Sequence, residues 1–378
     1  MDSLLYPEAI ARLKNDLEIA ANDWDYLSAI SGDGPIREFE KEFGDAAGGH
    51  YVVACSNATS AILMALAASG VERDDEVILP SYTWPQTLAP ILLIGARPVF
   101  ADIDSNSVTV SKESVRSCLS KKTRAIIVAH LFGIPADISS FEALAQERRC
   151  ALIYDGAQAF GAKYNEKGIG AYGDFVAYSF GRSKLLSVGE GGALVCRTRE
   201  LYERAIAFSQ HPLRMHRDID DNSMRKHIDG VALNFRMHPL IASLALGQLS
   251  GFLSSGKLEE LKETFWELRE CITTGGMEDI LPKIPPEGSP SGVCLPLVID
   301  RDERRMVEER LGELNIKVTE GGIQTPLHMS HTIQRRRFLC HEGIIGKRAF
   351  GRHTSHASEA CPNSERRCST SQVIIKIA

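Results

Sequence analysis

A single lysine stands within the stretch YSFGRSKLLSVGEGGALVC, which runs from position 178 to position 196. Lys184 follows a strand-like segment and precedes glycines at positions 189, 191 and 192, which would let the backbone turn tightly. One interpretation is a solvated lysine in a loop. The other is an amine that does chemistry, and such an amine needs a site that lowers its pKa or stores it as a Schiff base with an aldehyde.

Pyridoxal 5'-phosphate (PLP) is the common aldehyde of this kind, and it makes three further demands on a protein. Its ring nitrogen needs a carboxylate, so that the ring stays protonated and withdraws electrons. Its phosphate needs N–H groups and hydroxyls, preferably at a helix N-terminus. Its ring face needs a flat partner.

The chain has a candidate for each demand. Asp155 ends the strand-like segment ALIYD, although a turn or cap aspartate would look the same. Thr59 and Ser60 open a predicted helix and suit a phosphate, or else they only cap that helix. Trp84 follows a strand and offers a flat ring, or else it is a core tryptophan. Ser179 lies shortly before the lysine and either gives its hydroxyl to the phosphate or simply ends a strand.

Short apolar segments alternate with helical ones, and this alternation predicts a mostly parallel central sheet flanked by helices. We expect strands at 51–55, 76–80, 97–103, 124–130, 151–155, 175–180 and 192–196. We expect a first helix that begins near Pro7, with Ile10, Leu13, Leu17 and Ala20 on one face. We expect further helices after Pro35 and at 60–70, 85–95, 140–149, 199–210 and 237–253. Because parallel sheets bind ligands at the carboxyl ends of their strands, Asp155 would stand where a ligand binds.

The pattern changes towards the C-terminus. A strand, a helix and a strand at 291–300, 301–314 and 315–320 predict a smaller α+β domain. We therefore expect a large PLP-binding domain at 1–250, a small domain at 251–335, and an atypical tail at 336–378 for which disorder is one interpretation. This tail is rich in Lys and Arg, and its apolar pattern is weak until QVIIKIA.

Composition excludes several classes of protein. The net charge of −6 argues against a nucleic-acid partner, and no apolar run is long enough to span a membrane. The nine cysteines are scattered without zinc-ligand spacing, so we expect no metal and reduced thiols in the cytoplasm. The N-terminus carries acidic residues early and has helical periodicity, so we expect no signal peptide.

Several stretches together resemble the DegT/DnrJ/EryC1/StrS family of PLP-dependent sugar aminotransferases, in order and spacing across roughly residues 30–330. They are NATSAILMAL (57–66), VILPSYTWPQTLAPILLIGARPVFADID (77–104), HLFGIPADI (130–138), YDGAQAFGAKY (154–164), YSFGRSKLLSVGEGGALVC (178–196) and LNFRMHPLIASLALGQL (233–249). The resemblance implies a fold-type-I transferase.

The resemblance also implies a role for each candidate residue. Lys184 would form the Schiff base, Asp155 would pair with the ring nitrogen, and Gln158 would lie near the ring hydroxyl. Trp84 would stack on the ring, while Thr59, Ser60 and Ser179 would hold the phosphate. Asn234 would reach the phosphate of a second copy's cofactor, which implies a homodimer with shared sites. His328 matches a family position near the acceptor, although a structural histidine is an equal alternative.

One stretch and one position stand apart from these motifs. Residues 211–230 are polar, and we expect a long loop that is either solvated or a flap whose arginines, Arg214 among them, contact substrate. Ala58 stands where the family usually has glycine, and its Cβ would weaken phosphate binding if that position needed a positive φ.

The function implied is transfer of an amino group from L-glutamate or L-glutamine to a keto sugar, as in amino-sugar or aminoglycoside-type biosynthesis. The acceptor would be nucleotide-linked or a ketocyclitol. One alternative is a sugar dehydratase-like member, although such members carry histidine in place of the Schiff-base lysine. Another is a PLP-binding, regulatory homologue without turnover.

Overall fold

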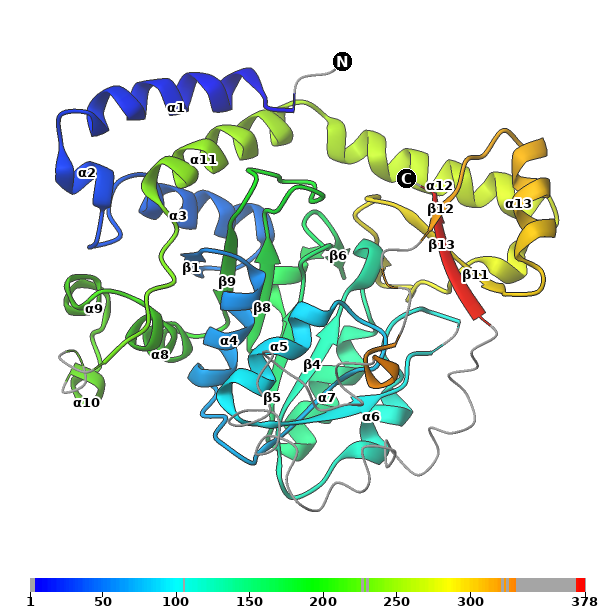
Figure 1. Cartoon of the computed structure of the whole chain (residues 1–378), viewed down its shortest axis with the longest axis horizontal. Helices are drawn as coiled ribbons and strands as arrows, with labels where there is room; N and C mark the ends of the chain where they lie inside the picture. Colours follow the sequence, from blue (N-terminus) through cyan, green and yellow to red (C-terminus); the bar gives the residue numbers. More distant parts are fainter. Residues whose placement is uncertain are drawn as a thin grey trace. The chain divides into compact units, whose positions relative to one another are not determined.

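The computed structural model describes residues 4–104, 106–225, 228, 231–320, 323, 326–330 and 372–377 (Figure 1). Its strands are β1 (Tyr51–Cys55), β2 (Glu76–Pro80), β3 (Arg97–Ala101), β4 (Thr123–Ala129), β5 (Ala151–Asp155), β6 (Lys163–Tyr164), β7 (Lys167–Gly168), β8 (Phe175–Ser179), β9 (Gly192–Cys196), β10 (Gly288–Ser289), β11 (Leu295–Asp300), β12 (Thr319–Glu320) and β13 (Gln372–Ile377).

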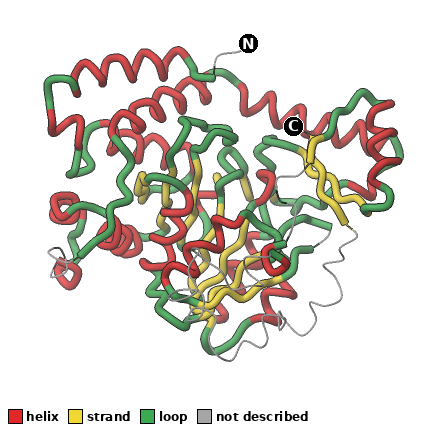
Figure 2. Tube along the Cα trace, viewed as in Figure 1, coloured by secondary structure: helices red, strands yellow, loops and turns green. Residues whose placement is uncertain are grey.

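Its helices are drawn in red in Figure 2. They are α1 (Pro7–Ala20), α2 (Trp24–Ser28), α3 (Pro35–Ala47), α4 (Ala58–Ala68), α5 (Pro85–Ile94), α6 (Lys112–Cys118), α7 (Ile138–Arg148), α8 (Arg199–Ser209), α9 (Pro212–Asp218), α10 (Asn222–Arg225), α11 (Pro239–Ser254), α12 (Lys257–Thr274) and α13 (Arg304–Glu313), with short 3-10 helices that include η4 (Leu327–Met329). None of the described helices is both long and apolar enough to cross a bilayer.

Seven strands pair in the order β1-β9-β8-β5-β4-β2-β3. Strand β2 runs parallel to β3 and β4, and β5 runs parallel to β8. Strand β9 runs antiparallel to both β1 and β8. The parallel pairs confirm the predicted, mostly parallel sheet. Short apolar strands joined through helices form such pairs and are buried on both faces.

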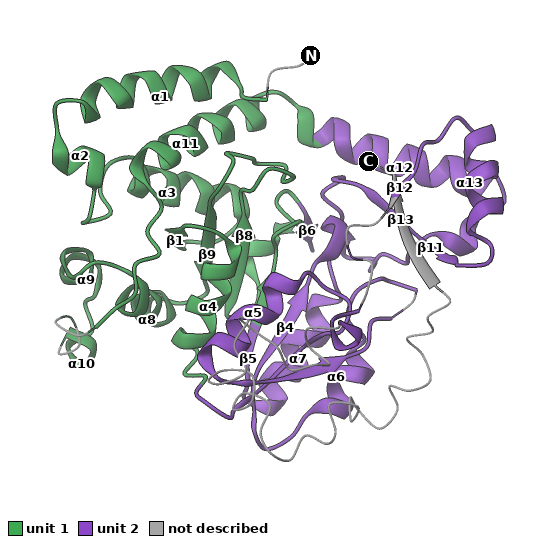
Figure 3. Ribbon diagram, viewed as in Figure 1, with its two compact units in different colours: residues 1–71, 153–161, 166–258 green, residues 72–152, 162–165, 259–378 purple. Residues whose placement is uncertain are grey.

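The chain divides into two compact units, coloured separately in Figure 3. Unit 1 comprises residues 1–71, 153–161 and 166–258, and unit 2 comprises 72–152, 162–165 and 259–378. Both units are assembled from segments that alternate along the chain, whereas the predicted domains follow one another. The predicted domain bounds stay a prediction.

In unit 1, α1 and α11 pack side by side (Figure 1). A Cβ placed on Gly247 of α11 would lie 2.3 Å from the Cα of Ala9, so the close approach of these helices requires glycine there. The pair is also held by a polar contact, because the buried Asp16 carboxylate accepts from the hydroxyl of Ser243 at 2.6 Å and from Arg12 at 2.7 Å. Arg12 and Ser243 hold the pKa of Asp16 below its usual value, although burial alone would raise it.

A buried charge cluster lies in the polar stretch for which we expected a loop. This stretch contains α9 and α10, and its positions 226, 227, 229 and 230 lie outside the described residues. Arg214 of α9 is 1% exposed, and one of its terminal nitrogens, Nη2, donates to both carboxylate oxygens of Glu40 at 2.8 Å. Its Nε donates to Asp218 at 3.1 Å.

These partners decide the role of Arg214. Burial alone would lower its pKa, but Glu40, Tyr202 and Asp218 raise it above the usual value, so the guanidinium stays charged in the interior. The guanidinium is engaged by carboxylates of its own unit, and the contact of Arg214 with substrate stays a prediction. Glu40 also accepts the backbone N–H of Ala54 in β1 at 2.8 Å, so the cluster supports that strand.

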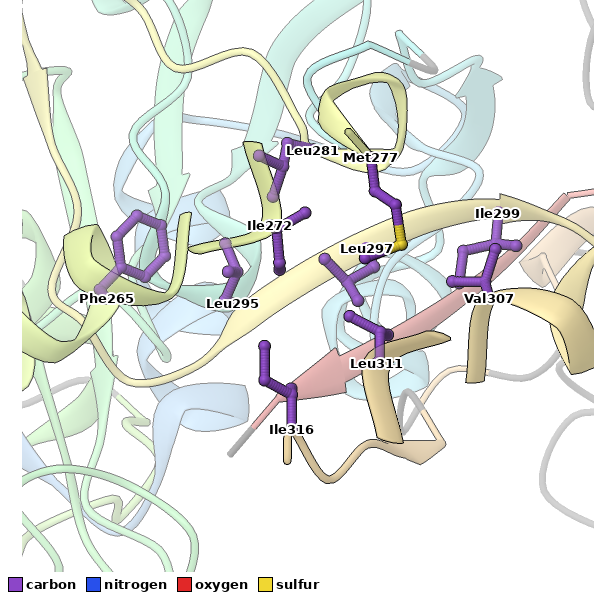
Figure 4. Close-up of a cluster of buried hydrophobic side chains, with 10 residues drawn as sticks. All are labelled: Phe265, Ile272, Met277, Leu281, Leu295, Leu297, Ile299, Val307, Leu311 and Ile316. Atoms are coloured by element: carbon purple, nitrogen blue, oxygen red, sulfur yellow. The ribbon is translucent and has the colours of Figure 1, made fainter. Parts of the chain in front are cut away.

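Unit 2 has its own core, in which side chains of β11, α12 and α13 meet (Figure 4). Leu295, Leu297 and Ile299 alternate along β11 and are all buried, as expected of a strand with one face in a core. Strand β13 pairs antiparallel with both β11 and β12. The predicted tail therefore contributes a strand at 372–377, while its residues 336–371 lie outside the described part of the chain.

The charge cluster generates a stability prediction. Glu40→Gln keeps the size of the side chain but removes the charge that compensates Arg214, so the free energy of unfolding in urea should fall by about 3 kcal/mol. The matched control is Glu309→Gln, which removes an exposed ion pair with Arg305 and should change that energy by less than about 0.5 kcal/mol. Equal unfolding energies for the two variants would contradict this account of the cluster.

Candidate functional site

One row of paired residues crosses three strands of unit 1. Gly192, at the start of β9, is paired with Cys55 at the end of β1 and with Ser179 at the end of β8. Directly paired residues point to the same face of a sheet, so Ser179 points to the face on which Gly192 would carry a side chain. The row therefore brings the ends of two strands, and the segments that follow them, close together.

Asp155 lies on the same face. It ends β5, where it is paired with Ala177 of β8. Because Ala177 and Ser179 are two residues apart on one strand, their side chains share a face, and Asp155 shares it with them. Asp155 is 9% exposed, and its carboxylate accepts the backbone N–H of Ala157 at 3.1 Å. The turn that follows carries the half-buried Gln158.

The start of α4 faces this row. Asn57 caps the helix from an extended conformation, and its side-chain oxygen accepts from the N–H of Ser60 at 2.9 Å and from the Ser60 hydroxyl at 3.0 Å. The helix therefore begins at Ala58, two residues earlier than predicted, and places Thr59 and Ser60 in its first turn. Asn57 performs the capping, which is the role that the sequence had left open for Thr59 and Ser60.

The first turn of α4 is suited to an anion. The earliest N–H groups of a helix have no partner within it, and the helix dipole is positive at this end. Within the described part of the chain, the N–H groups of Ala58 and Thr59 donate to no other residue. Since Ala58 has helical backbone, its Cβ causes no strain, and the expected cost of replacing glycine there does not arise.

Lys184 lies on a closed loop between β8 and β9. The neck of the loop is formed by Phe180, whose N–H donates to the carbonyl of Gly191 at 2.8 Å and whose carbonyl accepts from Val188 at 3.0 Å. Of the glycines at 189, 191 and 192, only Gly189 has a positive φ, +88°, and so serves the expected tight turn. Lys184 itself is half-buried, and its N–H donates to the carbonyl of Gly181 at 3.0 Å.

A buried amide holds this loop from α11. The side-chain nitrogen of Gln248 donates to the carbonyl of Ser187 at 3.1 Å, and its oxygen accepts the N–H of Tyr6 at 2.7 Å. Gln248 is 4% exposed. Gln248 was not among the predicted site residues, although a lone amide within the apolar helix PLIASLALGQLSGFLS is a signal of a buried polar contact.

Asn234 is exposed in the structure, on a segment that runs beside the end of β1. The N–H of Ser56 donates to the carbonyl of Phe235 at 2.9 Å, and Cys55 forms an antiparallel bridge with Arg236. The segment therefore lies beside the residues that lead into α4. Two apolar side chains shortly before Asn234 are also exposed, Val231 fully and Leu233 by 44%.

The remaining two candidates belong to unit 2. Trp84 precedes α5 and is 45% exposed, so it is not a core tryptophan of this unit. The N–H of Leu327 donates to the carbonyl of Ser81 at 2.7 Å, which holds η4, and with it His328, against the turn that precedes Trp84. Burial lowers the pKa of His328, with Asp102 opposing the shift, so the imidazole is neutral at pH 7.

The residues of unit 1 fit the chemistry that the sequence suggested. A face of the sheet carries a buried carboxylate and a hydroxyl, it meets the first turn of a helix that suits a phosphate, and the adjoining loop carries a lysine. This donor set matches a small molecule that bears both a phosphate and an aldehyde.

Comparison with known proteins identifies relatives. Residues 22–341 match the model of the DegT/DnrJ/EryC1/StrS aminotransferase family. The chain is 35% identical over 214 residues to the GDP-perosamine synthase of Escherichia coli O157:H7, a stretch that covers 57% of each protein. It is 34% identical over 199 residues to the L-glutamine:2-deoxy-scyllo-inosose aminotransferase of Streptomyces fradiae, covering 52% of this chain and 46% of that one. The chain spans about half the length of the curated relatives it matches.

The fold is similar to a solved structure, that of an aminotransferase from Psychrobacter cryohalolentis. The TM-score is 0.75 with 22% sequence identity, over 99% of this chain and 92% of the other. This likeness confirms the predicted fold class, and the family match extends the stretch over which we saw the resemblance. The chain belongs to the DegT/DnrJ/EryC1/StrS aminotransferase family.

Proposed function

We propose that the protein is a PLP-dependent sugar aminotransferase. The observation that carries the proposal is the arrangement in unit 1, where Asp155, Ser179 and the first turn of α4 meet at one face beside the loop of Lys184. Membership of an aminotransferase family supports it. PLP, when bound, supplies an electron sink for bonds at the carbon that carries the amino group.

The protein's own residues would then divide the work. Lys184 would hold the cofactor's aldehyde carbon, and when the donor's amine takes the place of its Nζ, that Nζ would take the proton from Cα of the donor as a general base. Asp155 keeps the ring nitrogen protonated, and Gln158 lies near the ring hydroxyl. Thr59, Ser60 and Ser179 bind the phosphate together with the N–H groups of α4. That Trp84 stacks on the ring stays a prediction from the resemblance.

For the substrates, we propose L-glutamate or L-glutamine as donor and a keto sugar as acceptor. The names of two relatives support this choice, since one is a GDP-perosamine synthase and the other uses L-glutamine with a deoxy-inosose. We place His328 near the acceptor, where a neutral imidazole can both donate and accept a hydrogen bond. The lysine at 184 favours amino transfer over the dehydratase-like alternative, which would carry histidine there.

We further propose a homodimer in which Asn234 of one copy reaches the phosphate in the other. In the single chain, Asn234 is exposed together with the apolar side chains of Val231 and Leu233. Neighbouring apolar side chains that are exposed together are typical of a surface that a partner covers. A second copy would bury them.

A cytoplasmic location stays a prediction from the scattered cysteines.

The proposed function predicts a spectroscopic half-reaction. The purified protein with PLP should show a long-wavelength absorbance band, and L-glutamate or L-glutamine should convert it to the pyridoxamine form. Lys184→Ala should remove this conversion and lower turnover at least about 100-fold, because it removes both the attachment point and the general base.

The matched control is Lys41→Ala, which removes an exposed lysine and should convert like the unchanged protein. A band that persists with both donors would favour the non-catalytic alternative. Full turnover by Lys184→Ala with bound cofactor would contradict the proposal.

The shared site predicts complementation between two inactive variants. Lys184→Ala and Asn234→Ala should each be impaired alone. Mixed at equal amounts after dissociation and reassembly, they should recover about a quarter of normal activity, because half the dimers are mixed and each mixed dimer has one intact site. No recovery, with mixed dimers demonstrated by mass spectrometry, would refute the shared site.

A further inference from the structure

Gly192 stands between the two segments that would bind the phosphate. It is paired with Cys55, after which the chain enters α4, and with Ser179 on the other side. Neighbouring strands lie about 4.8 Å apart, so the backbones of Cys55 and Ser179 are separated by about 10 Å, with Gly192 in the middle. Any side chain at Gly192 would point into the space that these two segments share.

Backbone atoms at the start of α4 already occupy the position that a side chain of residue 192 would take. A Cβ at Gly192 would lie 2.4 Å from the carbonyl carbon of Asn57 and 2.8 Å from the nitrogen of Ala58. The φ of Gly192 is not positive, so the backbone conformation itself would tolerate another residue. The neighbouring Gly191 differs, because its Cβ would meet only side-chain atoms of Phe180 and Met237, at 3.2 Å or more. Gly192 is therefore required by contact with the start of α4.

The consequence of a larger residue can be estimated. An ordinary contact between such atoms is about 3.5 Å, so alanine at 192 would push the backbone at Asn57 and Ala58 away by about 1 Å. Ser179 is on the far side of the same row and would not follow. A hydrogen bond stretched by about 1 Å is lost, so a phosphate could no longer bind Ser179 and the N–H groups of α4 together.

We propose that Gly192 is a positioning residue for the phosphate. Its missing side chain lets the N-terminus of α4 approach β9 closely enough for the helix and Ser179 to bind one phosphate group. This inference rests on the proposed function, and it adds a residue that touches neither the phosphate nor the reacting atoms.

The test compares two probes that differ only in the phosphate. The apoprotein and Gly192→Ala are titrated with PLP and with pyridoxal, and binding is followed by the absorbance of the lysine adduct. We expect the Kd for PLP to rise about ten- to hundredfold in Gly192→Ala, the loss expected for one to two hydrogen bonds to a charged group. The Kd for pyridoxal should equal that of the unchanged protein.

The matched control is Gly312→Ala, which makes the same substitution in α13, where a Cβ would meet nothing within 4 Å. It should bind both probes normally. Circular dichroism and thermal unfolding of the apoproteins report folding. If Gly192→Ala does not fold, the double variant Gly192→Ala/Ala58→Gly, whose backbone can yield at the point of contact, is titrated instead and should show the same selective loss.

The titrations with PLP and pyridoxal distinguish the role of Gly192 from the proposed function. An unchanged Kd for PLP in Gly192→Ala, or equal weakening of PLP and pyridoxal, would overturn the role of Gly192 while leaving the proposed function intact. Failure of both variants to fold would assign Gly192 to the stability of the sheet and would also overturn it. If the unchanged protein binds no PLP at all, the proposed function fails, and this inference fails with it.

Discussion

The pairing of β1, β9 and β8 at their ends is the constraint on which the site of unit 1 depends. Hydrogen bonds between these strands fix Cys55, Gly192 and Ser179 in one row. From one side of the row the chain continues into α4, and from the other it continues into the loop of Lys184. Groups that are more than a hundred residues apart in the sequence are thereby held at one face of the sheet.

Buried polar side chains hold the segments next to this row in place. Glu40 accepts the N–H of Ala54, the residue before Cys55, and is itself bound by Arg214. Gln248 holds the carbonyl of Ser187 in the lysine loop. Such contacts stabilise a single arrangement, because a buried amide or charge is costly in any other position where it lacks its partner. Buried polar contacts therefore lie beside the residues of the proposed site, whose positions the chemistry requires.

Much of the fold could be predicted from local patterns. The bounds of β1, β2, β5 and β9 agree with the predicted strands, because a strand buried on both faces is a short apolar run with sharp ends, whether its neighbours are parallel or antiparallel. The candidates Asp155 and Ser179 were found because they stand at the ends of such runs, and Lys184 because it lies between such a run and a group of glycines. The structure then shows that Asp155 and Ser179 share one face of the sheet, which spacing along the chain could not establish.

What the sequence could not reveal depends on contacts between distant segments. Helix α9 was missed because its mixed charges resemble a loop, while Arg214 is stabilised by Glu40, which lies far away in the chain. Strand β13 was missed because it forms only by pairing with β11 and β12. The requirement for Gly192 was attributed to a turn, whereas it arises from the backbone of Asn57.

The proposed site requires that α4, Ser179, Asp155 and Lys184 converge on one molecule. A crystal structure of the protein grown with PLP would show whether they do. We expect the phosphate at the first turn of α4 within hydrogen-bond distance of Ser179, the ring nitrogen beside Asp155, and continuous density from the ring to Lys184. A phosphate bound elsewhere, or a cofactor that makes no link to Lys184, would contradict it.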